Sequence, residues 1–186
     1  MEEELFKGEY RIKSIRLENW NYAEEGWYFV TICTEDRKLF FGKIEGGKMK
    51  LNKIGEIADI YLRSIPEHFP NARVDKYVIM PNHIHAIIVI DGSRDARSRV
   101  STNTDNAFAA QFGPLQPSSL SAIIQSYKSS VKRWCNKNDY KYFAWQPGYY
   151  EHIIRGDEDY QNIWNYIEYN PDKWEWDKSN PNNLNK

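Results

Sequence analysis

The spacing of apolar residues along this chain predicts both strands and helices. Stretches rich in aromatic and β-branched residues are typical of strands. Such stretches cover residues 27–34, 72–80, 83–90 and 149–155. A hairpin is expected over 39–51, where Gly46 and Gly47 supply its turn.

Helices are expected where apolar residues recur every three or four positions. The first covers 52–69, and the second runs from a cap at Ser118 or Ser119 to about Lys137. Asp157 is expected to cap the last helix, which Pro171 stops.

This order of elements indicates the α+β class, with an antiparallel sheet that carries its helices on one face. Residues 1–177 are expected to form one domain. Residues 91–119 have no periodicity and are predicted to be a long loop, and 178–186 a disordered tail.

Composition narrows the class of protein. With 41% hydrophobic and 27% charged residues the chain is typical of globular proteins, and no apolar run approaches the ~18 residues of a membrane span. Cys33 and Cys135 stand about a hundred positions apart in no disulfide pattern, which favours a reduced, cytoplasmic protein without a signal peptide. The net charge of −1 does not indicate nucleic-acid binding, and the basic clusters at 94–99 and 128–137 are typical of solvated faces.

The predicted strand 83–90 begins with His83 and His85, separated by Ile84. Alternate residues of a strand share a face, so the two imidazoles project together, roughly 7 Å apart along the backbone. Neutral imidazoles bind divalent ions well. Isolated His-x-His pairs are more often structural, but paired imidazoles in so apolar a strand are costly without partners. The residues alone leave both interpretations open.

Tyr166 and Asn170 lie four positions apart in the last predicted helix, and therefore on one face of it. A tyrosine hydroxyl can act as a covalent nucleophile, and an asparagine oxygen can complete the ligand set of a metal. The chain has 13 tyrosines, and Asn170 before Pro171 could equally cap the helix. This pattern too remains open by itself.

Four motifs, in this order, resemble one family. They are RLENWNYAEEGWYFVTICTEDRKLFFG (16–42), VIMPNHIHAIIVI (78–90), WQPGYYEHIIR (145–155) and DYQNIWNYIEYNP (159–171). Together they resemble the HUH single-tyrosine transposases, and most closely the REP-associated tyrosine transposase branch. The resemblance covers about residues 10–175 and implies a ferredoxin-like, RNA-recognition-motif-like HUH endonuclease fold.

The resemblance also implies roles for four residues. His83 and His85 match the HUH histidines, Asn170 the amide ligand of the metal, and Tyr166 the nucleophile. The implied cofactor is Mg²⁺ or Mn²⁺, and the implied partner is single-stranded or hairpin DNA. The implied reaction is DNA cleavage and rejoining at hairpin repeats through a 5′-phosphotyrosine, by a monomer or a homodimer.

Six further residues are candidates for contacts with DNA: Lys128, Lys132, Arg133, Gln146, His152 and Arg155. Basic side chains interleaved with aromatic ones can follow a single strand. Two other functions remain open on the sequence. The chain could be a metal-dependent nuclease in which water attacks, or a nucleic-acid-binding module without catalysis.

Overall fold

The structure is a computed structural model that describes residues 25–92, 118–177 and 179–183. Within these ranges a four-stranded antiparallel sheet has the order β4-β5-β1-β6. Its strands are β4 (Ala72–Ile79), β5 (His83–Ile90), β1 (Gly26–Cys33) and β6 (Tyr150–Ile153). β5 and β1 are therefore the central strands, and the predicted bounds of β5 are confirmed.

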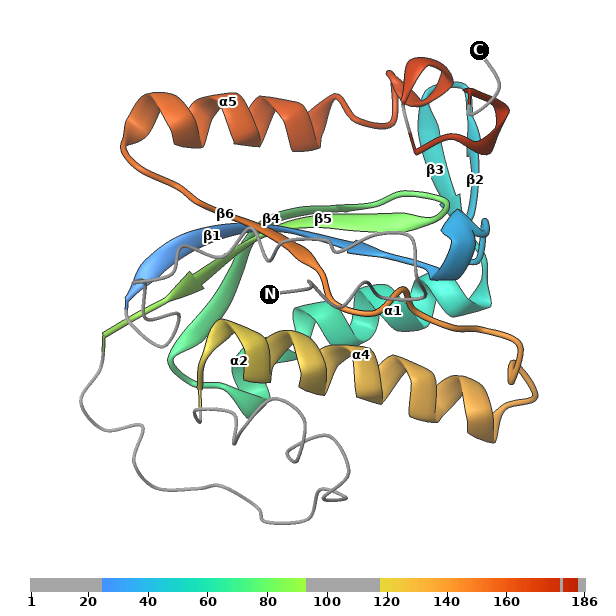
Figure 1. The fold of residues 1–186 in the computed structure, drawn as a ribbon, viewed down its shortest axis with the longest axis horizontal. Helices are drawn as coiled ribbons and strands as arrows, with labels where there is room; N and C mark the ends of the chain where they lie inside the picture. Colours follow the sequence, from blue (N-terminus) through green and yellow to red (C-terminus); the bar gives the residue numbers. More distant parts are fainter. Residues whose placement is uncertain (1–24, 93–117, 178, 184–186) are drawn as a thin grey trace, which may run out of the picture.

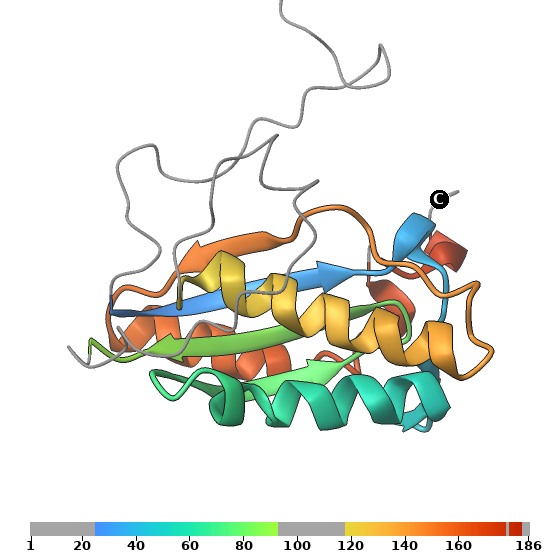
Figure 2. The same cartoon turned by 90° about the horizontal axis from the view of Figure 1, so that it is seen from below.

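Helices cover both faces of this sheet (Figures 1 and 2). One face carries α1 (Lys53–Arg63), α2 (Ile65–His68) and α4 (Leu120–Lys137), and α5 (Asp157–Glu168) lies on the other. The order β1-α1-β4 and β5-α4-β6 gives two interleaved βαβ units, which is the ferredoxin-like arrangement. The predicted α+β class and antiparallel sheet are confirmed, whereas the expectation that the helices lie on one face is wrong, because α5 packs on the opposite face.

Local signals in the sequence account for most element boundaries. Gly46 and Gly47 have φ angles of 57° and 71° and turn the chain between β2 (Gly42–Glu45) and β3 (Lys48–Leu51). The Ser119 hydroxyl accepts a hydrogen bond from the Ala122 amide at 3.3 Å, which caps α4 as expected.

The cap of α5 differs from the prediction. Gly156, with a φ angle of 84°, occupies the cap position and Asp157 is the first helical residue. The carboxylate that binds a backbone amide here belongs to Asp159, whose Oδ2 accepts from the Arg155 amide at 2.9 Å. The turn needs a left-handed residue before the helix, and glycine adopts that conformation without strain.

Alternation along β5 divides the apolar interior into two clusters. Ile84, Ala86, Ile88 and Ile90 belong to the larger cluster with α1 and α4. Ile87 and Val89 pack with Ile167 of α5 on the opposite face. His83 and His85 have the same parity as Ile87 and Val89, so they project toward the α5 face.

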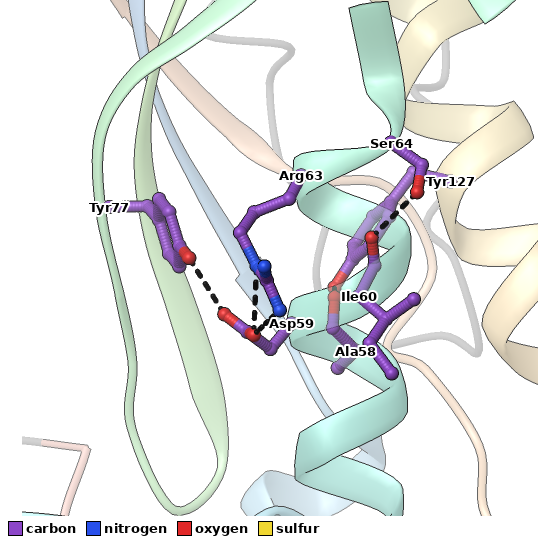
Figure 3. Close-up of polar contacts among 7 residues, drawn as sticks. All are labelled: Ala58, Asp59, Ile60, Arg63, Ser64, Tyr77 and Tyr127. Atoms are coloured by element: carbon purple, nitrogen blue, oxygen red, sulfur yellow. Dashed lines mark hydrogen bonds and ion pairs between the residues drawn. The ribbon is translucent and has the colours of Figure 1, made fainter. Parts of the chain in front are cut away.

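Polar contacts attach α1 to the elements beside it (Figure 3). Asp59 accepts a hydrogen bond of 2.7 Å from the Tyr77 hydroxyl of β4 and two from the Arg63 guanidinium. The Tyr127 hydroxyl of α4 donates to the Ala58 carbonyl at 3.0 Å. Burial and the Asp59 carboxylate raise the pKa of Tyr77 to about 12, so this hydroxyl stays a donor.

The chain continues past α5 into two short 3₁₀ helices, η2 (Trp174–Trp176) and η3 (Pro181–Asn183). The disordered tail predicted for 178–186 therefore contains an ordered turn in its described residues. The Asn183 carboxamide donates to the Glu175 and Asp177 carbonyls, at 2.7 and 3.0 Å, which ties η3 to η2.

Most of the predicted loop, 93–117, and the first 24 residues, which include part of the N-terminal motif, lie outside the described residues. None of the helices in the described ranges is long and apolar enough to span a membrane.

Candidate active site

Two adjacent imidazoles stand at the start of the central strand β5. His83 and His85 are 1% and 5% exposed, and their ring centroids are 4.5 Å apart. The Phe29 ring of β1 stacks on His85 at 5.3 Å, and the Trp174 ring of η2 lies 6.2 Å from His83. The pair is therefore enclosed by protein rather than solvated.

The Nδ1 atom of each imidazole has a polar partner. Nδ1 of His83 lies 2.8 Å from Asn82 Oδ1, and Nδ1 of His85 lies 2.8 Å from Thr31 Oγ1. An amide oxygen can only accept, so Nδ1 of His83 carries the hydrogen and Nε2 keeps its lone pair. Such orientation through the second nitrogen is typical of metal-binding histidines.

α5 carries Tyr166, whereas Asn170 lies in the turn after it, two residues beyond the helix end at Glu168, and not in the helix as predicted. The Tyr166 hydroxyl lies 3.2 Å from Nε2 of His85, and the two ring centroids are 5.0 Å apart. Asn170 is 3% exposed, whereas Tyr166 is 45% exposed. The sequence singles out two residue pairs about eighty positions apart. The structure brings these four residues together: His83, His85, Tyr166 and Asn170.

Two buried acceptors at this site have no partner among the described residues: Nε2 of His83 and Oδ1 of Asn170. A buried polar atom left unpaired costs about 1–3 kcal/mol, so each such atom requires an explanation. A divalent cation would satisfy both, and two imidazoles with one amide oxygen are a chemically suitable donor set. Within the described ranges no three His, Cys, Asp or Glu side chains are grouped to hold a metal ion. A metal here therefore depends on the amide of Asn170.

Burial sets the protonation of this site. It lowers the pKa of His83 to about 4, against the opposing charge of Asp177, and lowers the pKa of His85 well below its usual value. Both imidazoles are therefore neutral at pH 7, as metal ligation requires. Burial, and then the Asp177 carboxylate, raise the pKa of Tyr166, so the phenol holds its proton unless a cation approaches.

Asn82 links the site to two distant segments. Its carboxamide donates to the Arg37 carbonyl at 2.9 Å and to the Ser179 carbonyl at 2.7 Å. Both donors are thereby used, which fixes Oδ1 toward His83. Nothing in the sequence indicates this role except that Asn82 precedes His83. The role of Thr31 likewise has no sequence signal beyond its alternate position in the first strand.

Cys33 lies opposite His83 in the β1–β5 register. It is 5% exposed, and burial raises the pKa of its thiol. The thiol is therefore protonated, and the sequence prediction of a free cysteine holds.

Three of the residues considered for DNA binding lie on α4, across the sheet from Tyr166. The Lys128 ammonium donates to the carbonyls of Gln146 and Gly148, at 2.7 Å each, and burial lowers its pKa to about 8. The Lys132 ammonium donates to the carbonyls of Lys141 and Phe143. Arg133 is exposed. The two lysines thus hold the segment that leads into β6.

The other three candidates lie near β6. The exposed His152 is paired with Asp159 at 2.9 Å, and its neighbour in the register is Phe29, on the α5 face. Arg155 is exposed and precedes α5. Gln146 is partly buried, and its backbone amide donates to the Cys33 carbonyl at 2.9 Å. His152 and Arg155 are therefore nearer to the tyrosine helix than the α4 residues are.

Known proteins resemble this chain in sequence and in fold. An uncharacterised protein of Haemophilus influenzae is 38% identical over 166 residues, which cover 89% of this chain and 91% of the relative. A second protein of that organism, named "Putative REP-associated tyrosine transposase", is 29% identical over 156 residues, which cover 82% and 74%. No family model matches the chain.

The solved structure of a REP-associated tyrosine transposase bound to a REP hairpin has a similar fold. Its TM-score is 0.57 at 19% identity, over 88% of this chain and 77% of that one. The resemblance to REP-associated tyrosine transposases, inferred from the motifs, is thus confirmed. These relatives point to a DNA transposase.

Proposed function

We propose that this relative of the REP-associated tyrosine transposases cleaves and rejoins single-stranded DNA at hairpin repeats through a 5′-phosphotyrosine. The observation that carries the proposal is that the hydroxyl of the half-exposed Tyr166 lies 3.2 Å from His85 Nε2, beside two unpartnered buried acceptors. A nucleophile must reach substrate while its activating groups stay fixed, and this arrangement satisfies both needs.

Tyr166 would supply the nucleophile. Its phenolic oxygen attacks phosphorus, a new O–P bond forms, and the bond from phosphorus to the 3′ oxygen breaks. The phenolic proton passes to water, and the departing 3′ oxygen takes up a proton. Because the phosphotyrosine keeps a phosphodiester linkage, a second 3′ hydroxyl can reverse the step and join strands without ATP.

His83, His85 and Asn170 would hold the cofactor, Mg²⁺ or Mn²⁺. When bound, the divalent ion polarises the scissile phosphate as a Lewis acid. The protein's part is to keep both imidazoles neutral by burial and to orient them through Asn82 and Thr31. The unpartnered Nε2 and Oδ1 atoms support this ligand set.

Hairpin DNA is the proposed partner because the structural relative in the comparison is bound to a REP hairpin. The exposed His152 and Arg155, next to α5, are the better placed of the candidate contacts. Lys128, Lys132 and Arg133 would have to act on the other face of the sheet.

The test is covalent capture of labelled single-stranded hairpin DNA, resolved on a denaturing gel with and without Mn²⁺. The proposal expects an adduct with the native protein that disappears in Tyr166→Phe and in EDTA. Tyr169→Phe is the matched control, because Tyr169 is exposed to a similar extent (51%) three positions further along the chain.

The outcome separates the alternatives. Cleavage that survives Tyr166→Phe would mean that water attacks and would overturn the tyrosine mechanism. Binding without cleavage, unchanged in His83→Ala and independent of metal, would favour a module without catalysis.

A further inference from the structure

A polar pocket opens at the C-terminal segment, next to the candidate active site. Its volume is about 520 Å³, and its lining residues are Glu175, Trp176, Asn180, Asn182 and Asn183. This volume lies within the roughly 300–1,000 Å³ that are typical of small-molecule sites. The residues come from the two 3₁₀ helices η2 and η3.

Side chains inside the segment hold the shape of this pocket. The Asn180 carboxamide donates to the Trp174 carbonyl at 3.0 Å, and Asn180 Oδ1 accepts from the Asn182 amide at 3.1 Å. The Asn183 carboxamide joins η3 to η2, as described above. Asn180 is 6% exposed, so the pocket has a buried polar base.

The exposed side chains that line the pocket suit a flat aromatic ligand. Trp176 is 76% exposed, and no ring contact to it occurs among the described residues. Glu175 and Asn182 are also exposed, and within the described ranges neither side chain has a polar partner, so a carboxylate and a carboxamide remain available. The described residues that line the pocket are one carboxylate, one indole and three carboxamides.

Two contacts connect the segment that forms the pocket to His83 and its neighbour Asn82. Trp174 of η2 lies 6.2 Å from the His83 ring, and Ser179, next to Asn180, accepts from the Asn82 carboxamide. Trp174 and Ser179 therefore hold the segment that carries the pocket beside His83.

We infer that this pocket binds one unpaired nucleobase of the DNA strand beside the cleaved phosphate, stacked on Trp176. The Glu175 carboxylate can accept from the exocyclic amino group of cytosine, whereas the single donor of thymine, N3–H, lies between two carbonyl oxygens that repel a carboxylate, so the pocket favours cytosine. The pocket is then a specificity site for the strand. This inference rests on the proposed function in taking single-stranded DNA as the ligand.

The experiment measures fluorescence anisotropy of labelled d(T)10 and d(C)10 in EDTA, so that no cleavage occurs. Trp176→Ala is expected to weaken binding of both by roughly 5- to 150-fold, which corresponds to the loss of one stacked base. Trp176→Phe should restore most of the affinity, because a ring remains. Tyr142→Ala is the control, since Tyr142 is 63% exposed and lies outside this segment.

The role of Glu175 is read from the ratio of the two affinities. The native protein should prefer d(C)10 over d(T)10 by about tenfold, the value of one hydrogen bond to a charged group, and Glu175→Gln should reduce that preference. Native affinity in Trp176→Ala, or an equal loss in Tyr142→Ala, would overturn the pocket. The anisotropy measurement does not detect the covalent adduct, so its failure would leave the tyrosine mechanism standing. Failure of the covalent-capture test would in turn leave the measured affinities interpretable.

Discussion

The Tyr166 hydroxyl and Nε2 of His85 are 3.2 Å apart, and Nδ1 of the same imidazole lies 2.8 Å from the Thr31 hydroxyl. One histidine therefore connects the tyrosine helix α5 to the central strand β1. The position of the proposed nucleophile depends on this imidazole, and the orientation of the imidazole depends on Thr31.

Replacing Thr31 with valine should disturb His85 without changing the volume of the side chain. Nδ1 of His85 would lose its partner, and orientation of this kind is typically worth 10- to 100-fold in metal affinity or activity. We expect Mn²⁺ affinity, measured by calorimetry, to fall by that factor. Thr31→Ser keeps the hydroxyl and should bind as the native protein does; equal losses in both variants would contradict the role of the hydroxyl.

Divalent cations should raise the thermal stability of the native protein. A ligand that binds only the folded state stabilises it by about 2.7 kcal/mol at a concentration of 100 times Kd. The unfolding temperature of the native protein should therefore rise with Mn²⁺ concentration, and that of Asn170→Ala should rise much less, because the variant lacks the amide oxygen. Asn165→Ala, at an exposed position in α5, is the control. Identical curves for native protein and Asn170→Ala would remove Asn170 from the ligand set.

Asn82→Ala should destabilise the fold as well as the site. The change leaves the Arg37 and Ser179 carbonyls and Nδ1 of His83 without this partner, at about 1–3 kcal/mol for each group that stays buried. We expect the free energy of unfolding in urea to fall by at least about 2 kcal/mol. Asn138→Ala, which removes one exposed contact to the Trp134 carbonyl, should cost less; a similar loss in both would mean that Asn82 is not central.

Stability should decrease as the pH falls below neutrality. The folded-state pKa of His83 is about 4 and that of His85 is also lowered, whereas a histidine in the unfolded chain titrates near 6.5. Between these values the unfolded chain binds more protons, so unfolding becomes easier toward acid, by up to about 1.4 kcal/mol per pH unit for each histidine. Urea denaturation of the metal-free protein at pH 7.5 and 5.0 measures the slope. His83→Gln with His85→Gln should flatten it, and an unchanged slope would refute this assignment.

Lys128→Met should affect stability more than DNA affinity. The ammonium of Lys128 binds two backbone carbonyls on the α4 side of the sheet, and its removal should cost about 1–3 kcal/mol in urea. A phosphate contact would instead lower the slope of log affinity against log salt by about one, as we expect for Arg155→Ala. A reduced salt slope in Lys128→Met would restore Lys128 to the DNA surface.

The strand that carries the two histidines could be predicted from the sequence. The residues that surround these histidines could be predicted less well. The alternation in 83–90 is local, so the bounds of β5 and the face that carries its histidines could be predicted, whereas the last helix ends at Glu168, before Asn170. Nothing local indicates that the carboxamide of Asn82 reaches Arg37 and Ser179. The cap at Gly156 was missed because aspartate is the commoner cap, and the choice depended on a backbone angle.

The basic residues of α4 illustrate a second limit. Their spacing indicated a charged stripe, but whether a lysine meets phosphate or a backbone carbonyl depends on the path of residues 141–148. That path is set by contacts distant in sequence, such as the bridge between Thr34 and Trp145. Local patterns carry no information about such contacts.

Side chains alternate strictly between the two faces of β5, so the register of this strand decides on which face the histidines lie. His85 pairs with Thr31 and Val78 on the neighbouring strands, and Ile84 pairs with Ile32 and Ile79. A slip of one residue would turn both imidazoles into the interior beneath α1 and α4, and would expose Ile84 and Ala86 toward α5. Misregistered chains would thus lose the two proposed ligands at once and leave two buried polar rings without their partners, so they would be both inert and unstable. Correct pairing of this one strand is the step that assembles the proposed metal site in a folding chain.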